Sequence, residues 1–300
     1  MNYNKLYMNT PYIVFAQLTN CGTFKQIIET LKDQIIRVPF EFVKPIEEDT
    51  DDFDKQGGIK IYAVNNDKTV IICTKLMASD MKQYYVEQMV NIMFDILPVY
   101  KFIKTLAKTN VLSIYITKNK TDKIVFDAGY TKHEQNILNQ KNKPKIPEEL
   151  KFDIEVIIKA KKLKETCSRI NNYGEVVEIT CTKNDLKFKY VDHDTTNGVD
   201  IYSVNSEYED YNATINFGEN VPSTMIYQGH FNVNNLMIFG KCYTLCEDVR
   251  IALRNNYLMF ISSTIGTLGV ILIGITPHDN KQYDQSTELF GSKQIQMIEK

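Results

Sequence analysis

The residue types that most often bind metals or catalyse reactions are sparse in this sequence. Its 300 residues include four histidines and six cysteines. Asp192-His193-Asp194 resembles a metal-binding cluster, but it falls between two strand-like segments, where Asp, Thr, Asn and Gly favour a turn. Cys242 and Cys246 form a C-x-x-x-C pair, and no second pair completes a zinc site. We therefore predict no metal, no cofactor and free thiols.

Motifs typical of nucleotide-dependent and hydrolytic enzymes are also missing. The sequence contains no P-loop, no G-x-G-x-x-G and no G-x-S-x-G. No histidine has a carboxylate or cysteine at a recognisable catalytic spacing. These absences predict a protein that is not an enzyme and that depends on a separate protein for any ATP-driven step.

Lysine is the residue type whose spacing does indicate a function. Taken singly, a row of lysines on a helix is typical of a solvated surface. Here the rows recur on three of four helices that the sequence predicts, and such a surface can bind a phosphate backbone without reading bases. Because the net charge is -2, the positive charge must be gathered on one surface and offset elsewhere. The predicted DNA-binding residues are Lys25, Lys32, Lys101, Lys104, Lys108, Lys161, Lys162, Lys164, Arg169 and, alone on the fourth helix, Lys241.

An internal repeat predicts the elements that position these lysines. Residues 14–35 and 152–170 each read as a strand followed by an amphipathic helix, and Phe24 aligns with Leu163. Thr23 and Gln26 predict a capping box at the start of the first helix.

A second pair of segments repeats in the same way. The residues from Phe94 onward match those from Phe231 onward, again as a strand that leads into a helix. Each helix is followed by strand-like sequence, as in VLSIYIT and LGVILIGI. The fold class is therefore α+β, with two similar domains of two strand-helix-strands units each and helices on one face of antiparallel sheets.

Composition shifts predict the domain limits. We expect an N-terminal domain over residues 1–130, an extended connector over 131–150, a C-terminal domain over 151–277 and a mobile tail over 278–300. Residues 46–58 are acidic and predict an exposed loop. The residues before Tyr12 do not resemble a signal peptide and no apolar run suits a bilayer, so we expect an intracellular protein without a membrane partner. Abundant Asn, Lys, Ile and Tyr without Trp suggest an AT-rich genome, such as that of a large DNA virus or a protist.

From Tyr12 to Pro277 the chain resembles the PCNA family of DNA sliding clamps. The resemblance is most specific in LKETCSRINNYGEVVEITCTKNDLKFKYV, which begins at Leu163 and includes Cys167. The ITP that ends at Pro277 resembles the last strand of the family. Gly274 stands where the family often has an aromatic residue.

The resemblance implies a homotrimeric ring that encircles double-stranded DNA as a polymerase processivity factor and serves replication and repair. It implies partners with PIP-box-like peptides, including DNA polymerase, and a separate ATP-dependent clamp loader. It also implies a nuclear location or a cytoplasmic viral replication factory. The subunit interface is expected near residues 110–117 and 175–183. The implied peptide pocket comprises Val64, Ile71, Ile137, Leu138, Ile275 and Pro277, although core packing alone is the commoner explanation for any one of them.

Three other functions remain open on the sequence. The chain could be a monomeric or dimeric crescent-type processivity factor. It could be one subunit of a heterotrimeric clamp, including a checkpoint clamp. The same fold could also serve as a viral transcription factor, because a fold does not fix a function.

Overall fold

The chain divides into two units. The sequence repeat also predicts two domains. The computed structural model describes residues 10–46, 53–138, 152–192, 196–241, 243–255 and 257–278. Unit 1 comprises residues 1–63, 74–141 and 267–269, and unit 2 comprises 64–73, 142–266 and 270–300. Residues 64–73, from the first half of the sequence, thus belong to unit 2, and residues 267–269, from the second half, belong to unit 1. The limits predicted at residues 130, 150 and 277 stay predictions.

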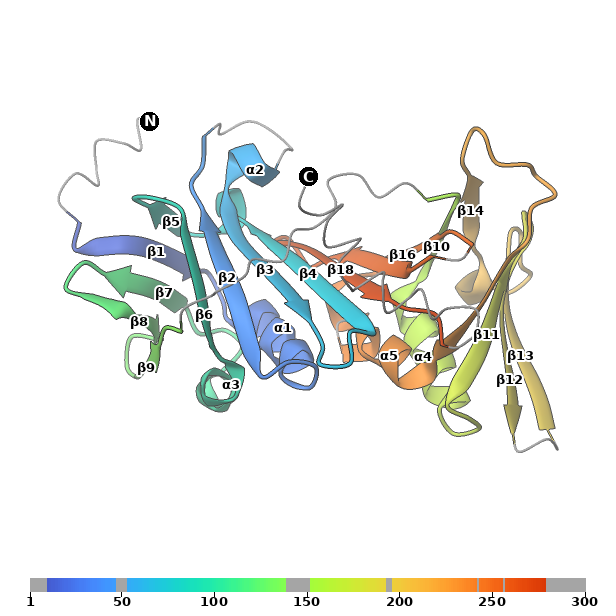
Figure 1. The fold of residues 1–300 in the computed structure, drawn as a ribbon, viewed down its shortest axis with the longest axis horizontal. Helices are drawn as coiled ribbons and strands as arrows, with labels where there is room; N and C mark the ends of the chain where they lie inside the picture. Colours follow the sequence, from blue (N-terminus) through green and yellow to red (C-terminus); the bar gives the residue numbers. More distant parts are fainter. Residues whose placement is uncertain are drawn as a thin grey trace. The chain divides into compact units, whose positions relative to one another are not determined.

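Unit 1 contains strands of two antiparallel sheets (Figure 1). Two longer helices, α1 and α3, each follow a strand, and α2 is a short helix of four residues. One sheet has the strand order β5-β1-β7-β8-β9 and the other includes β4-β3-β2-β6. The elements are β1 (Tyr12–Leu18), α1 (Gly22–Lys32), β2 (Arg37–Val43), α2 (Phe53–Gln56), β3 (Gly58–Val64), β4 (Val70–Met77), η2 (Ala78–Asp80), β5 (Gln83–Val86), β6 (Val90–Asp95), α3 (Ile96–Thr105), β7 (Leu112–Thr117), β8 (Lys120–Asp127) and β9 (Lys132–Asn136).

Four phenylalanines form the core of unit 1. Phe24 of α1 contacts Phe40 of β2 and Phe126 of β8, with ring centroids 6.2 and 6.3 Å apart. Phe94 of β6 contacts both Phe40, at 4.9 Å, and Phe126, at 5.8 Å. All four side chains are buried, so the two sheets and α1 share one hydrophobic core.

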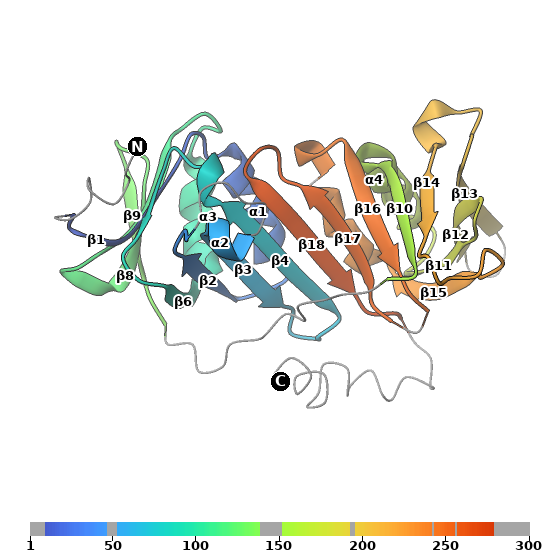
Figure 2. The same ribbon diagram turned by 90° about the horizontal axis from the view of Figure 1, so that it is seen from above.

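Unit 2 repeats this plan with the strand orders β14-β10-β16-β17-β18 and β13-β12-β11-β15. Figure 2 shows the first of these sheets face on. The elements are β10 (Ile154–Lys159), α4 (Ala160–Ile170), β11 (Val176–Cys181), β12 (Asp185–Asp192), β13 (Thr196–Ser203), η3 (Glu209–Tyr211), β14 (Thr214–Phe217), β15 (Tyr227–Asn232), α5 (Val233–Met237), η4 (Phe239–Lys241), η5 (Tyr243–Leu245), β16 (Asp248–Leu253), β17 (Met259–Thr264) and β18 (Gly269–Ile275).

The strand-to-helix steps match the repeat closely. Phe94 and Phe231 are each the last residue but one of a strand, and a helix begins two residues later at Ile96 and at Val233. The apolar face predicted for residues 163–170 is buried as α4. The predicted hairpin is also present, since β12 pairs with β13 from Asp185–Ser203 to Asp192–Thr196. The predicted α+β class is confirmed.

The capping box predicted at Thr23 is wrong. Helix α1 begins at Gly22, and its N-cap Cys21 accepts no local side-chain bond of the expected kind. The turn before β7 holds this helix end instead, because Gly22 N donates to Lys108 O at 3.0 Å and Cys21 Sγ lies 3.0 Å from Ala107 O. A tertiary contact has replaced the local cap.

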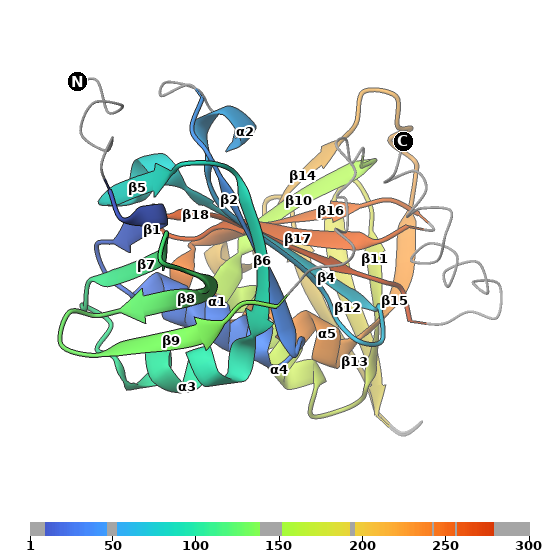
Figure 3. The same cartoon turned by 60° about the vertical axis from the view of Figure 1, so that its left-hand side comes forward.

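Two segments predicted as irregular carry regular structure. Within the acidic loop, Phe53–Gln56 form α2. Within the predicted connector, Lys132–Asn136 form β9, which pairs with β8 at the edge of its sheet (Figure 3). The remainder of the acidic loop (47–52), most of the connector (139–151) and the tail after His278 lie outside the described residues. Among the described residues, no helix has the length and apolarity needed to span a membrane.

Candidate nucleic-acid interface

Helix α3 carries the most available positive charge in unit 1. Lys101 and Lys104 are exposed, and no ion pair with either is found among the described residues. The ammonium of Lys104 lies 5.9 Å from the centre of the Tyr100 ring. Such a contact leaves the lysine charge uncompensated, so these two side chains can bind an anion such as a phosphate.

Lys108 does not belong to the helical row predicted for it. Helix α3 ends at Thr105, because the backbone of Leu106 is extended and Ala107 N donates to Asn110 Oδ1 at 2.8 Å in a turn. Lys108 lies in that turn, where its side chain is exposed. The prediction of a three-lysine stripe on the helix is therefore wrong, although the lysine itself remains exposed beside the start of α1.

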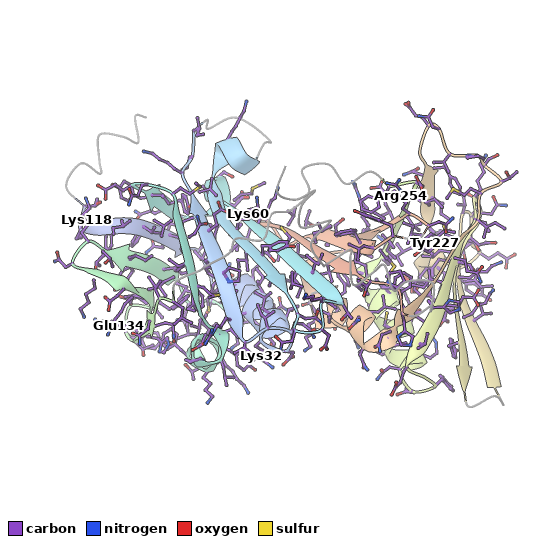
Figure 4. All side chains as sticks on the ribbon, in the orientation of Figure 1. Lys32, Lys60, Lys118, Glu134, Tyr227 and Arg254 are labelled. Atoms are coloured by element: carbon purple, nitrogen blue, oxygen red, sulfur yellow. The ribbon has the colours of Figure 1, made fainter. Side chains whose placement is uncertain are left out.

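The lysines of α1 are engaged by neighbouring groups. Lys25 Nζ donates to the carbonyl oxygens of Lys104, at 2.8 Å, and Leu106, at 3.0 Å. These acceptors lie at the carboxyl end of α3, where a positive charge is favourable. Lys32 contacts Asp33 at 2.6 Å and lies 4.7 Å from the centre of the Tyr100 ring. The hydrogen bond to Asp33 raises the pKa of Lys32. Figure 4 shows Lys32 beside the helices of unit 1, away from Lys60 on β3.

Helix α4 presents a different arrangement. Lys162 Nζ lies 3.0 Å from Glu165 and 3.1 Å from Asp210, and these hydrogen bonds raise its pKa. Arg169 binds Asp200 of β13 through two nitrogens, at 2.6 and 3.2 Å. These bonds raise the pKa of Arg169 further. Two of the four predicted α4 cations are therefore paired with carboxylates.

The other two α4 cations have no carboxylate partner among the described residues. Lys161 is exposed, and Lys164 lies 5.5 Å from the centre of the Tyr243 ring. Lys161 and Lys164 are three positions apart on α4, as Lys101 and Lys104 are on α3, so each pair lies on one face of its helix.

The fourth helix is shorter than the sequence predicts. Helix α5 spans five residues, Val233–Met237, and Asn232 caps it by accepting a hydrogen bond from Asn234 N at 2.8 Å. Lys241 follows in the separate 3-10 helix η4, next to Gly240, and is exposed. Its position is thus set by irregular structure.

The six residues predicted for the peptide pocket fall into two groups. In unit 2, the end of β18 is tied to the start of β4, because Thr276 N donates to Thr69 O at 2.9 Å. Ile71 lies two residues after Thr69, Ile275 and Pro277 flank Thr276, and Val64 lies at the end of β3. Ile275 is 0% exposed, so its side chain belongs to the core.

The remaining two pocket residues belong to unit 1. Ile137 N donates to Asp122 O at 2.8 Å, and Leu138 N donates to Met93 O at 2.7 Å. Both side chains are half-buried. Their assignment to a pocket stays a prediction.

The strands predicted to form a subunit interface are interior strands. Strand β7 pairs with both β1 and β8, and β11 pairs with both β12 and β15. Their backbone groups are already used on both sides, so the prediction is wrong. Among the described strands, the sheet with β7 ends at β5 and β9, and the sheet with β11 ends at β13 and β15; β9 pairs with β8 and β13 pairs with β12.

Sequence reasoning missed the carboxylates that pair with α4. Glu165 was visible at three residues from Lys162, but Asp200 and Asp210 are far away in sequence. The aromatic rings beneath Lys162 and Lys164 were missed for the same reason. No periodicity links such residues, since only the fold brings them together. Cys242 and the candidate metal ligands His193 and Asp194 lie outside the described residues, and the described part of the chain holds no cluster of three metal-ligating side chains.

Known proteins similar to this chain are described as DNA polymerase sliding clamps or as proliferating cell nuclear antigen. No family model matches the sequence. A "Probable DNA polymerase sliding clamp" of Acanthamoeba polyphaga mimivirus is 22% identical over 233 residues, covering 75% of this chain and 48% of that protein. The chain thus spans about half the length of this relative. "Proliferating cell nuclear antigen" of Caenorhabditis elegans is 19% identical over 269 residues, covering 87% of this chain and 95% of that protein.

A third relative and a solved structure extend the comparison. "Probable DNA polymerase sliding clamp 1" of Paramecium bursaria Chlorella virus 1 is 21% identical over 262 residues, covering 83% of this chain and 95% of that protein. The crystal structure of Proliferating Cellular Nuclear Antigen from Entamoeba histolytica matches with a TM-score of 0.72 at 14% identity, covering 89% of this chain and all of that one. By fold and by these relatives, two of them viral, the chain is similar to PCNA-type sliding clamps.

Proposed function

We propose that this protein is a DNA sliding clamp, a non-enzymatic processivity factor that encircles double-stranded DNA. The observation that carries the proposal is the match of both units to a PCNA fold. Lys101 and Lys104 support it, because they are exposed, have no carboxylate partner among the described residues and can contact phosphates without base specificity. Affinity would then come from encirclement together with weak, screened contacts.

The ring would be a homotrimer closed through the terminal strands β9 and β13. Each has a free side along most of its length among the described strands, apart from a bridge between Ser203 and Asn212. Pairing β9 of one copy with β13 of the next is a head-to-tail contact, which forms a closed ring when the rotation per copy allows it. It would also cover two strand edges that otherwise invite aggregation.

The partners follow from the same proposal. DNA polymerase and other proteins with PIP-box-like peptides would bind at the predicted pocket, where Ile71 and Pro277 lie close to the β4–β18 contact. A separate ATP-dependent loader would open the ring. The protein would act in the nucleus or in a cytoplasmic viral replication factory, without a cofactor and without a membrane partner.

One observation favours a heterotrimeric clamp as the second candidate. On β13, Val199 and Ile201 are 49% and 42% exposed, whereas the exposed residues of β9 are Lys132, Glu134 and Asn136. An apolar strand edge beside a charged one is a poor match between identical copies. A different subunit with an apolar edge would cover β13 better.

The decisive experiment is the solution mass, measured by light scattering across a dilution series. A homotrimer predicts a stable mass near three times 34.7 kDa. The substitution Ile201→Glu should lower that mass by placing a charge on the β13 edge, whereas the matched control Ile226→Glu, also exposed but outside β13, should not. A monomer at every concentration would contradict the self-assembling ring.

DNA topology separates the remaining candidates. A closed ring loaded on circular DNA should be retained, and it should slide off linear DNA with free ends. A crescent-shaped factor should bind both equally. A viral transcription factor should prefer particular sequences, which a clamp should not.

A further inference from the structure

An acidic segment folds against the basic side of α4. We call the residues Glu207, Tyr208, Glu209, Asp210 and Tyr211 the acidic turn. It contains η3 (Glu209–Tyr211) and directly follows the region of β13. The turn is anchored to β13 behind it, because Ser203 bridges to Asn212 and Ala213 N donates to Ser203 O at 3.0 Å. Its position beside α4 is therefore set by the sheet of unit 2.

Two side chains of the turn hold Lys162. The carboxylate of Asp210 lies 3.1 Å from Lys162 Nζ, and the ring of Tyr211 lies 5.5 Å from the same nitrogen. Tyr211 in turn packs on the buried Tyr202, with ring centroids 5.3 Å apart. Tyr202 is hydrogen-bonded to Thr166 of α4 at 2.8 Å. The turn therefore contacts the helix in two ways. Tyr211 packs on the buried Tyr202, and Asp210 forms an ion pair with Lys162.

The Asp210 carboxylate is exposed enough for a phosphate to replace it beside Lys162. The side chain of Asp210 is 65% exposed, while that of Lys162 is 19% exposed. An ion pair with one partner in water contributes little to stability and is easily screened. A phosphate group carries the same charge type as the Asp210 carboxylate, so it can compete for Lys162 at small cost.

We propose that Asp210 is an internal counterion that, together with Glu165, occupies Lys162 in place of a phosphate and so lowers the DNA affinity of α4. This inference rests on the proposed DNA-binding function and adds an affinity-setting residue to it. Asp210 acts on DNA through Lys162 and need not touch DNA itself. Lys161 and Lys164 lack this control, because neither has a carboxylate partner among the described residues.

The neighbouring Glu209 provides a matched control. It is exposed on the same turn, and no ion pair involves it among the described residues. Asp210→Asn and Glu209→Gln each remove one negative charge from the turn. Any effect of net charge alone should therefore be equal in the two variants.

The test is binding of a short linear duplex, which can enter a ring from its end, followed by fluorescence anisotropy between about 50 and 200 mM NaCl. D210N should bind more tightly than wild type at low salt. Because Glu165 remains beside Lys162, the salt dependence of D210N should be steeper by at most about 0.9 in log-log slope, the value for one full additional phosphate contact. The gain in affinity should therefore shrink by at most roughly threefold across that salt range. E209Q should match wild type in slope, and D210N should have no effect in a Lys162→Gln background.

The outcomes distinguish the inference from the proposed function. Equal behaviour of D210N and E209Q, in a protein that binds the duplex, would overturn the internal counterion alone. Persistence of the D210N effect in the Lys162→Gln background would overturn it as well. Absence of duplex binding by wild type and all variants at low salt would overturn both proposals.

A measurement without DNA checks the ion pair itself. After reductive methylation with a carbon-13 label, the Lys162 resonance reports the pKa of its amine. Hydrogen bonds to Glu165 and Asp210 raise that pKa in the wild-type protein. The pKa should fall toward its ordinary value in D210N and stay unchanged in E209Q. An unchanged pKa in D210N would contradict the pairing.

Discussion

Helices α3 and α4 differ in how many of their cations are paired with carboxylates. On α3, Lys101 and Lys104 project without a carboxylate partner among the described residues. On α4, Lys162 and Arg169 are paired with Asp210 and Asp200, respectively. Both helices carry several positive side chains. On α4, however, two of these charges are neutralised by carboxylates.

The difference arises from what lies beside each helix. The start of α1 lies beside the end of α3, and Lys25 of α1 donates hydrogen bonds to backbone carbonyls there. Beside α4, β13 and the acidic turn supply carboxylates. A lysine count on a helix thus predicts DNA affinity only after the neighbouring strands are known.

The largest expected effect comes from removing the free lysines. Replacing Lys101, Lys104 and Lys108 together by Gln should weaken duplex binding by roughly tenfold or more at low salt. The log-log salt slope should fall by about 2.7, because each lost phosphate contact removes about 0.9. Anisotropy titrations at several salt concentrations measure both quantities.

The control for that variant keeps the same change in net charge. Lys44, Lys60 and Lys82 lie on or beside strands of unit 1 and can be changed to Gln together. Their replacement should leave the salt slope nearly unaltered. An equal loss in the two triple variants would show that the lysines of α3 and of the turn after it have no special role.

A second effect should appear in stability, at a paired cation of α4. Arg169→Met leaves the carboxylate of Asp200, which is 12% exposed, without its guanidinium. We expect the free energy of unfolding to fall by about 2 kcal/mol, the usual cost of an unsatisfied charged group at such a site. Urea denaturation measures it. Lys161→Met on the same helix should change stability by less than about 0.5 kcal/mol. Equal effects would contradict the division of α4 cations into paired and free.

A smaller effect should distinguish the two lysines of α1. Lys25→Met removes two hydrogen bonds to carbonyls at the end of α3, so we expect a loss of about 1 kcal/mol. Lys32 binds only its exposed sequence neighbour Asp33 and a tyrosine ring, and its replacement should cost less. Thermal unfolding of the two variants gives the comparison. A greater loss for Lys32 would reverse this assignment.

The smallest expected effect concerns buried thiols. Burial raises the pKa of Cys167 on α4 and of Cys181 on β11 to about 12. A raised thiol pKa adds stability that is complete below its ordinary value of 9.0 and is lost as the pH rises toward 12. Native alkylation of both thiols should therefore be slow at neutral pH and accelerate with pH.

The same labelling reaction compares the two units. Cys21 at the start of α1 also has a pKa raised by burial. Arg169→Met should speed labelling of Cys167 by loosening α4, and it should leave labelling of Cys21 unchanged. Mass spectrometry resolves the two sites. Equal acceleration at both would show that the Arg169–Asp200 pair stabilises more than its own unit.

Local patterns carried most of the fold and little of the site. The repeat placed Phe94 and Phe231 at equivalent strand ends, because burial at fixed spacing survives sequence change. The start of α1 was missed, since a turn more than eighty residues away caps it. The end of α3 before Lys108 was missed because the lysine spacing continues after the helix stops.

The charge pairing and the strand order depend on the whole fold. Nothing in the residues of β7 or β11 shows that each has a neighbour on both sides. Asp210 lies forty-eight positions after Lys162 in the printed sequence, and their contact follows from the path of β13 between them. Positions of lysines were therefore predictable, whereas their availability was not.

The cross-strand pair of Gly274 and Phe260 limits which residues can replace each other in this sheet during evolution. A methyl group added at Gly274 would come within 2.8 Å of the Phe260 ring, which also packs on Phe152 with centroids 5.3 Å apart. A side chain at position 274 therefore requires a smaller residue at position 260, and the reverse exchange is equally constrained. Among homologous sequences, the two positions should vary together, with bulk passing from one strand to the other while their sum stays nearly constant.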